Sequence, residues 1–295
     1  MSKSNYELFK DYVEDFTPPI LWRNLVSLKL WLENAWIGGS LKAEWEFIAE
    51  GWSYEEKILV RGWDEKNILK VYQNKWNKFV ELVKSPTPLA IAHESDLTDN
   101  ESVGFQNTIL AFAYSLALAA HKKDELSFLD WGGGIGHYNL FAQMLLPKIE
   151  INYHCKDLPI LAAYGTELFP TAQFYVDESC LENSFDFVMA SGSLHYEKDW
   201  ASLLDKLTKA SKKYLFITRL PMILSKPSFI FIQRPYRQGY NTEYLGWCLN
   251  RSEFLAKTQE FQLKLVREFI IDERPNIAKA PEQCKYRGFL FQTKA

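Results

Sequence analysis

A strand, a run of glycines and a helix follow one another in the middle of this 295-residue chain, and this succession restricts the fold more than any other feature. The segment 128–131 is apolar around one acid, Asp130. Glycine then occupies four of the next five positions after Trp131: Gly132, Gly133, Gly134 and Gly136. Residues 138–146 carry apolar side chains at helical spacing, which predicts an amphipathic helix. Glycine lets the backbone turn sharply and approach a ligand, and the helix start offers unpaired N–H groups, so the order is typical of a nucleotide-binding α/β unit.

The glycine spacing separates the possible ligand classes. A dinucleotide fingerprint requires G-x-G-x-x-G or its alanine variant, but the last position is His137 counted from Gly132 and Asn139 counted from Gly134. A P-loop requires a lysine after its last glycine, and none follows here. The pattern that fits is D-x-G-x-G-x-G, which resembles motif I of the class I S-adenosylmethionine (SAM) methyltransferases. A structural glycine turn and a unit for another nucleotide are the alternatives.

This resemblance implies roles for the motif. In the family, the glycine loop lies beside the methionine part of SAM, and the acid lies near the amino group of the cofactor. Asp130 is therefore expected to face the aminoacyl end of SAM. The loop beside it is expected to consist of Gly132, Gly133, Gly134 and Gly136.

Composition indicates a globular protein and narrows its partners. Hydrophobic residues make up 47% of the chain and charged residues 24%, which predicts a packed core. A net charge of −3 without a basic run gives no sign of a nucleic-acid partner. The cysteines lack C-x-x-C spacing and the histidines lack metal-site spacing, so we expect buried thiols and no metal. The apolar run 109–120 is too short to span a bilayer and no signal-peptide pattern is present, so a cytoplasmic protein is expected.

Strands and helices alternate from Leu126 onward, which predicts a mostly parallel sheet with right-handed crossovers. The expected strands are 127–131, 149–155, 172–176, 184–190 and 213–218, with helices at 159–168 and 198–210. An irregular insertion is expected at 221–250, then a helix at 251–260 and two long strands at 262–272 and 286–293. Class I methyltransferases end with such an antiparallel pair. The predicted fold is therefore a Rossmann-like class I methyltransferase sheet of seven strands with an antiparallel last strand.

The first part of the chain shows a helical pattern and many tryptophans. We expect a helical cap at 1–104, with a helix at 64–83, followed by the SAM-binding domain at 105–295, which begins with a helix at 105–122. Tryptophan occupies seven positions before residue 80: Trp22, Trp31, Trp36, Trp45, Trp52, Trp63 and Trp76. Aromatic side chains at helical spacing are usually core. A lid over an acceptor pocket and a membrane-surface contact through 22–31 are the alternatives.

Two acids follow predicted strands at places where a nucleotide is bound. Asp157 lies 21 residues beyond Gly136, where an acid can accept hydrogen bonds from ribose hydroxyls; it could instead cap the helix that starts at Pro159. The neighbouring Leu158 is expected on the cofactor side. Asp177 follows the next strand, and the family resemblance implies a bond to the adenine amino group; a loop acid facing water is the alternative.

The resemblance extends to later parts of the chain. Ser191 and Gly192 end the fourth predicted strand and are expected beside the cofactor. Together with D-L-P at 157–159, A-S-G-S-L-x-Y at 190–196 and I-x-R-x-P at 217–221, the motifs are similar to those of a little-characterised bacterial family of methyltransferases. That family is associated with surface-polysaccharide gene clusters, which implies a glycan or sugar-nucleotide acceptor.

Candidates for catalysis and acceptor binding come from the loops after the later strands. His195 follows the fourth strand, and its unperturbed pKa suits a general base near neutrality; packing under the cofactor is the alternative. Arg219 and Arg234 flank the insertion and could hold an anionic acceptor, or they could form ion pairs within the domain. We therefore expect a SAM-dependent methyltransferase acting on an oxygen or nitrogen of a small molecule or glycan. The alternatives are a non-catalytic SAM-binding or scaffold module and an NAD-dependent nucleotide-sugar enzyme.

Overall fold

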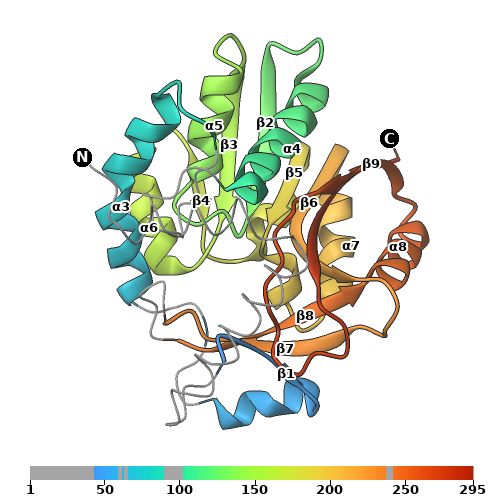
Figure 1. Cartoon of the computed structure of the whole chain (residues 1–295). Helices are drawn as coiled ribbons and strands as arrows, with labels where there is room; N and C mark the ends of the chain where they lie inside the picture. The colour runs from blue at the N-terminus through green and yellow to red at the C-terminus, as the bar shows by residue number, and fades with distance from the viewer. Residues whose placement is uncertain (1–42, 59–61, 63–65, 90–101, 237–241, 295) are drawn as a thin grey trace, which may run out of the picture. The chain divides into compact units, whose positions relative to one another are not determined.

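Seven strands form a central sheet in the order β4-β3-β2-β5-β6-β10-β9 (Figure 1). The strands are β2 (Glu125–Trp131), β3 (Glu150–Lys156), β4 (Gln173–Tyr175), β5 (Phe185–Ser191), β6 (Ser211–Ile223), β9 (Lys264–Ile270) and β10 (Lys285–Gln292). Strands β4, β3, β2, β5 and β6 are parallel, and β10 runs antiparallel to both β6 and β9. This is the Rossmann-like fold of the class I methyltransferases, so the predicted fold class is confirmed.

The computed structural model describes residues 43–58, 62, 66–89, 102–236 and 242–294. Residues Met1–Ala43 and Glu44–Ala295 form two units, and all of the described helices and strands belong to the second. The predicted membrane-surface stretch at 22–31, together with Trp36 and Trp63, lies outside the described residues.

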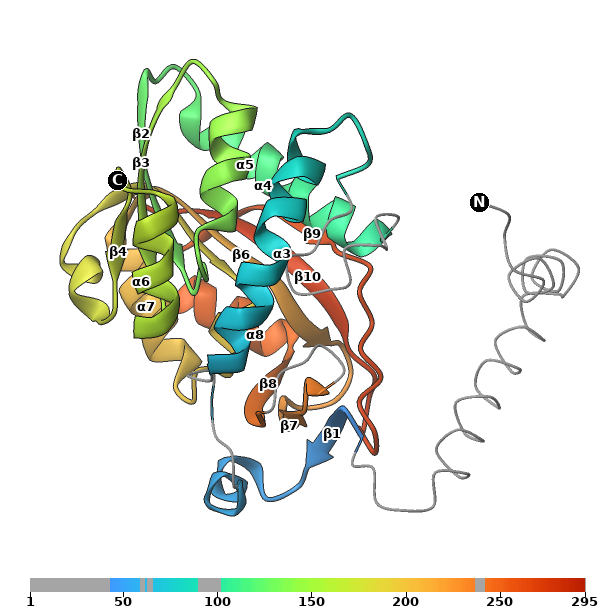
Figure 2. The same cartoon turned by 90° about the vertical axis from the view of Figure 1, so that its left-hand side faces the viewer.

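Helices cover both faces of the central sheet. They are α3 (Lys66–Lys84), α4 (Val103–Ala120), α5 (His137–Leu145), α6 (Pro159–Leu168), α7 (Trp200–Ala210) and α8 (Arg251–Glu260). Side chains alternate along β2, so Phe128 packs with α3, α4 and α5, while Leu129 and Trp131 pack with α7 and α8. Figure 2 shows α3 beside α5 and α6, which it contacts. The helices predicted at 64–83 and 105–122 are confirmed as α3 and α4.

Helix α4 is apolar on most of its surface, and by length and composition alone it could cross a membrane. Half of it is buried in this structure, where it packs on β2, β5, β6, β9 and β10. A helix that is apolar all round is expected either in a protein core or in a bilayer. The buried half of α4 packs as a core helix does, and Val103, Leu110 and Tyr114 are exposed on its other side.

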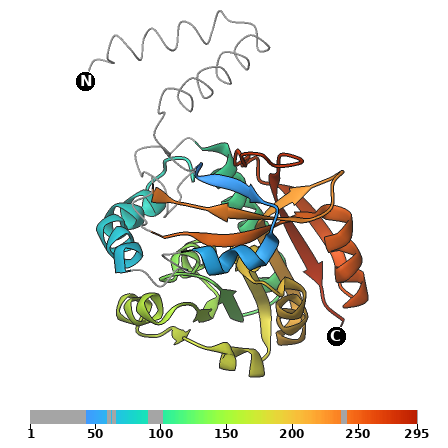
Figure 3. The same cartoon turned by 90° about the horizontal axis from the view of Figure 1, so that it is seen from below.

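A second, smaller sheet branches from the end of β6, and it corrects two expectations. Strands β1 (Trp45–Ile48), β7 (Phe229–Gln233) and β8 (Tyr244–Asn250) lie side by side (Figure 3), and β8 pairs in parallel with the last residues of β6. The insertion at 221–250 is therefore not irregular throughout, because it contains the end of β6 and the strands β7 and β8, and β7 is buried along its whole length. The chain before 104 is not entirely helical either, and both β1 and α3 belong to the same unit as the central sheet.

Arg234 connects these strands from inside. Its side chain is 1% exposed, with Nη1 3.0 Å from Glu46 Oε2 on β1 and Nε 3.1 Å from Glu243 Oε1 beside β8. The guanidinium therefore belongs to an ion-paired cluster in the smaller sheet. The expectation that Arg234 binds an acceptor is corrected, because its charge is already compensated within the fold.

Replacing Arg234 with methionine should lower the free energy of unfolding by about 3–5 kcal/mol, because Glu46 and Glu243 would lose their buried counter-charge. Urea unfolding followed by circular dichroism measures this. The control is Arg274→Met, which removes an exposed pair with Asp272 and should cost less than about 1 kcal/mol. Equal effects of the two substitutions would contradict a structural role for the Arg234 cluster.

Candidate functional site

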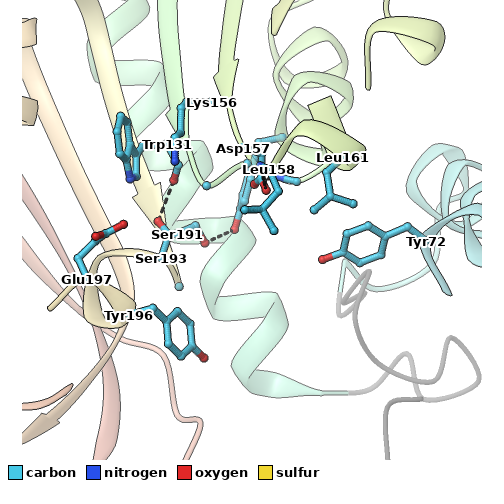
Figure 4. Close-up of a pocket in the computed structure, with 15 residues that line it drawn as sticks. Tyr72, Trp131, Lys156, Asp157, Leu158, Leu161, Ser191, Ser193, Tyr196 and Glu197 are labelled. Atoms are coloured by element: carbon cyan, nitrogen blue, oxygen red, sulfur yellow. Dashed lines mark hydrogen bonds between the residues drawn. The ribbon is translucent and has the colours of Figure 1, made fainter. Parts of the chain in front are cut away.

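A pocket opens at the carboxyl ends of β2, β3 and β5, where the strand order reverses (Figure 4). Open α/β sheets bind their ligands at this position. The lining comes from α3 and from the last residue of each of three strands with the segment that follows it: Tyr72 on α3; Trp131, Gly132, Gly133, Gly134 and Tyr138 from β2 onward; Lys156, Asp157, Leu158 and Leu161 from β3 onward; and Ser191, Gly192, Ser193, Tyr196 and Glu197 from β5 onward. The sequence predicted the glycines 132–134, Asp157, Leu158, Ser191 and Gly192 at this place, and all of them line the pocket.

The glycine turn is packed too tightly for a side chain at Gly132 or Gly133. Gly132 has φ +72°, and a Cβ atom there would collide with the side chain of Ser193. A Cβ atom on Gly133 would collide with the carboxyl group of Asp130 beneath it. Gly136 differs from the rest of the motif because it does not line the pocket; with φ +93° it caps the start of α5 and packs against Phe169. Gly136 was predicted to belong to the loop beside the cofactor, but here it forms the turn into α5 instead.

Asp157 links the end of β3 to the glycine turn. One carboxylate oxygen accepts from the backbone N–H of Gly134 at 2.7 Å, and the other accepts from the N–H of Leu158 at 2.7 Å. Leu158 is the residue that caps α6, and Pro159 occupies the first turn as expected. Asp157 therefore does not cap α6, which was the alternative to a contact with the ribose. A carboxylate oxygen has two lone pairs, so both oxygens can still accept from a ligand hydroxyl.

Polar contacts hold the loop after β5 against the glycine turn. Ser191 Oγ lies 2.8 Å from Tyr138 Oη, and Ser193 Oγ donates to the carbonyl of Trp131 at 2.7 Å; Figure 4 shows both contacts. Gly192, with φ +66°, donates its N–H to the carbonyl of Thr218 on β6. The pocket floor is thus fixed from three strands at once.

Asp130 supports the site from below and does not line it. Its side chain is 0% exposed, and Oδ2 accepts a hydrogen bond from Tyr153 Oη at 2.7 Å. Burial is the main cause that raises the pKa of Asp130 from 3.8 to about 7, and the nearby Asp157 adds to the increase while the Tyr153 hydrogen bond opposes it. The expectation that Asp130 faces the aminoacyl end of a cofactor is corrected, because the turn at Gly133 lies between this carboxyl and the pocket.

His195 is buried outside the pocket, so its predicted role as a general base is corrected. The imidazole is 1% exposed and lies 4.0 Å from the ring of Tyr196, measured between ring centroids, with Phe231 and Tyr286 at 6.1 and 6.4 Å. The next two residues, Tyr196 and Glu197, line the pocket in its place. Tyr196 Oη donates to Gln233 on β7 at 2.7 Å, so the smaller sheet helps to position this edge.

Two further predicted residues lie away from the pocket. Asp177 follows β4 as expected, but its exposed carboxylate accepts from Ser179 N–H and caps the short helix Glu178–Glu182. Arg219 lies on β6 with its Nε 3.5 Å from Glu273 and its guanidinium 5.4 Å from the centre of the Phe105 ring. Neither lines the pocket, and Arg219 forms the ion pair that was the alternative to acceptor binding.

Sequence reasoning missed the contribution of α3. Its residues Tyr72, Trp76 and Phe79 surround the ring of His137 at centroid distances of 5.4, 5.5 and 4.9 Å. His137 directly follows the glycine turn, so α3 is packed on the start of α5 and brings Tyr72 to the pocket wall. The helical tryptophan pattern indicated a buried face, but it did not indicate that a tyrosine of this helix reaches the site.

The chemistry available in the pocket is that of carboxylates, hydroxyls and one amine. Lys156 Nζ lies 4.7 Å from the centre of the Trp131 ring. No group of histidine, cysteine and acidic side chains in the described ranges could hold a metal ion. All four cysteines are buried thiols, as expected.

No protein-family model and no curated protein matches the chain. Among solved structures, it is similar to SAM-bound magnesium protoporphyrin IX methyltransferase from Synechocystis PCC 6803, with 12% identity, TM-score 0.46, and coverage of 79% of this chain and 99% of that chain. An S-adenosylmethionine-dependent methyltransferase from Clostridium acetobutylicum is similar with 10% identity, TM-score 0.45, and coverage of 75% and 99%. An O-methyltransferase family protein from Burkholderia thailandensis shows 16% identity, TM-score 0.44, and coverage of 77% and 70%. Similarities of this size establish neither an activity nor an acceptor. The inference of function therefore rests on the strand order and the pocket of this chain.

Replacing Asp130 with asparagine should stabilise the protein, and more so at high pH. Because the pKa of Asp130 is raised on folding, the folded protein holds a proton that the unfolded chain has lost, and stability falls as the pH rises through about 7. Asparagine does not ionise, so the variant does not lose this stability. Its free energy of unfolding should therefore exceed that of the wild type by more at about pH 8 than at about pH 5, with a difference on the order of 2 kcal/mol. Urea unfolding at the two pH values measures it. The control Asp205→Asn, which breaks an exposed pair with Lys209, should change little at either pH.

Proposed function

We propose that this chain is a SAM-dependent methyltransferase whose cofactor occupies the pocket at the carboxyl ends of β2, β3 and β5. One observation carries the proposal. The glycine turn, Asp157 and the Ser191–Ser193 segment follow three different strands, yet they line one pocket on a class I methyltransferase sheet. A glycine turn without a ligand-binding role would not require an acid and a small-residue loop on the two neighbouring strands.

Each part of the pocket suits one part of SAM. The oxygens of Asp157 can accept from the ribose hydroxyls, and Leu158 and Leu161 offer an apolar surface to the base. The hydroxyls of Ser191, Tyr138 and Tyr72, with the backbone of Gly132–Gly134, offer polar partners for the aminoacyl end. When bound, SAM supplies a methyl group on a sulfonium centre, which is open to attack by an oxygen or nitrogen nucleophile.

Methyl transfer is an in-line displacement, so the protein contributes mainly by holding the reactants in alignment. Tyr196 and Glu197 form the pocket edge after β5, where an acceptor would approach, and Glu197 is the pocket carboxylate available to take a proton. The sequence resemblance is what supports a glycan or sugar-nucleotide acceptor. An adenine contact by Asp177 and an acceptor contact by Arg219 are not part of the proposal, because neither residue lines the pocket and Arg219 is paired with Glu273.

Calorimetry with SAM, S-adenosylhomocysteine (SAH) and NAD tests the cofactor. We expect SAM and SAH to bind and NAD not to bind. Asp157→Ala should weaken SAM binding at least about 100-fold, because two hydrogen bonds to a charged group would be lost. Asp205→Asn, on α7, is the matched control and should bind as the wild type does. NAD binding without SAM binding, or an unchanged affinity in Asp157→Ala, would overturn the assignment.

A methyl-transfer screen distinguishes an enzyme from a SAM-binding module. Tritiated SAM is incubated with sugar nucleotides, glycan fragments and small hydroxy and amino compounds, and label in the product is counted. Transfer that is lost in Glu197→Gln while SAM affinity is kept would support catalysis at this pocket. SAM binding without transfer to any acceptor class would favour the non-catalytic module.

A further inference from the structure

A buried acid lies directly under the glycine turn, and nothing in the proposed chemistry uses it. Asp130 is fully enclosed, and its Oδ2 accepts from Tyr153. Its Oδ1 is buried as well and has no hydrogen-bond partner among the residues that the structure describes. A buried carboxylate without full hydrogen bonding is costly, so this group carries a strong bias toward its neutral form.

The carboxyl group is separated from the pocket by a single layer of backbone. A Cβ atom added to Gly133 would collide with Asp130 from above, and Gly133 itself lines the pocket. Direct contact between Asp130 and a ligand is therefore blocked. A charge on Asp130 can still interact with a charge on a ligand in the pocket, because the electric field extends across the peptide unit and protein screens charges less than water does.

The groups that face Asp130 leave it without a counter-charge. Tyr153 and Cys155 on β3 are neutral, because burial raises both of their pKa values well above the ordinary range. Asp157, at the end of β3, is acidic and raises the pKa of Asp130. Within the described part of the chain, no lysine, arginine or histidine forms an ion pair with Asp130. An empty site thus holds a carboxyl that is neutral or only partly ionised near pH 7.

We propose that Asp130 gives up its proton when the positively charged cofactor enters the pocket and then acts, through the turn at Gly133, as the buried counter-ion of that charge. The proton passes to solvent, and no bond to the cofactor forms. This inference rests on the proposed function, since SAM brings a sulfonium and an ammonium charge against one carboxylate. Asp130 is a positioning residue here: it selects for a cation without touching it.

Cofactor affinity should then depend on pH in a defined direction. Below the pKa of the empty site, part of the binding free energy is spent on removing the proton, so affinity rises with pH and levels off above about pH 8. If the cofactor lowers the pKa of Asp130 by about one unit, affinity increases roughly tenfold across this range, and about half a proton is released near pH 6.5.

Calorimetry of SAM binding in pairs of buffers with different ionisation enthalpies measures the released proton directly. The amino group of SAM titrates at a somewhat higher pH, so the wild type is compared with Asp130→Asn, which supplies the baseline from the ligand. We expect Asp130→Asn to lose the extra proton release and the rise in affinity. Asp205→Asn should keep both. Circular dichroism at each pH confirms that the variants are folded.

A second variant separates titration from packing. Tyr153→Phe removes the hydrogen bond that lowers the pKa of Asp130, so the midpoint of the affinity profile should move to higher pH. A purely structural role for the pair would lower affinity at all pH values without moving the midpoint. SAH lacks the sulfonium charge, so smaller proton release with SAH than with SAM would assign the effect to that centre, and equal release would assign it to the ammonium.

The outcomes separate this inference from the proposed function. If neither SAM nor SAH binds at any pH, the proposed function itself fails. If both bind tightly but the wild type and Asp130→Asn release the same number of protons at about pH 6.5, the methyltransferase assignment stands and the role of Asp130 is overturned.

Discussion

The site depends on a turn that has no space for a side chain at two of its glycines, Gly132 and Gly133. The backbone of Gly132 lies against Ser193, and that of Gly133 lies against Asp130. A Cβ atom added to Gly133 would also be 2.9 Å from the sulfur of Cys155. Because the backbone lies this close to its neighbours, the N–H of Gly134 reaches Asp157 at 2.7 Å and Ser193 reaches the carbonyl of Trp131. A side chain at either glycine would push the turn outward and break these links. Close packing therefore holds the ends of β2, β3 and β5 in one arrangement, and the pocket is its result.

The opposite edge of the pocket depends on the way β6 divides between two sheets. Two residues of β6, Thr218 and Arg219, face the single Gly288 of β10, and Arg219 has a left-handed φ of +50°. Such a bulge bends a strand and increases its twist, which here turns β6 from the central sheet toward β8. The smaller sheet then supports the loop after β5. Gln233 accepts from Tyr196, and Trp247 Nε1 donates to the carbonyl of Lys198. An insertion distant in sequence thus sets the position of the residues proposed to meet the acceptor.

The alternation of strands and helices was enough to predict the central sheet, and motif spacing was enough to place Asp157, Leu158, Ser191 and Gly192 at the pocket. These predictions succeed because parallel strands deliver their carboxyl ends to one edge. The predictions that were wrong depend on where a side chain points or on which residue far along the chain it contacts. His195 lies in the predicted loop, but Phe231 and Tyr286 enclose it. Arg234 is paired with Glu46, 188 positions away. Strand β1 has only four residues, too few for a visible period, and its partners, β7 and Ala278, lie about 180 or more positions further along the chain.

The two acids around the glycine turn lie in environments that give them different tasks. Asp157 is only partly buried, and each of its oxygens accepts one backbone N–H, so it can recognise hydroxyl groups by geometry at short range. Asp130 is enclosed beneath the turn with one tyrosine as its partner, so it can affect a ligand only through its charge. Pairs of carboxyl groups held in unlike surroundings commonly divide recognition and proton-linked roles in this way. The turn keeps the two environments apart: its backbone closes Asp130 off from solvent and at the same time supplies the N–H that orients Asp157. The glycines of the motif are therefore needed as much for the separation of these two acids as for the close approach of a ligand.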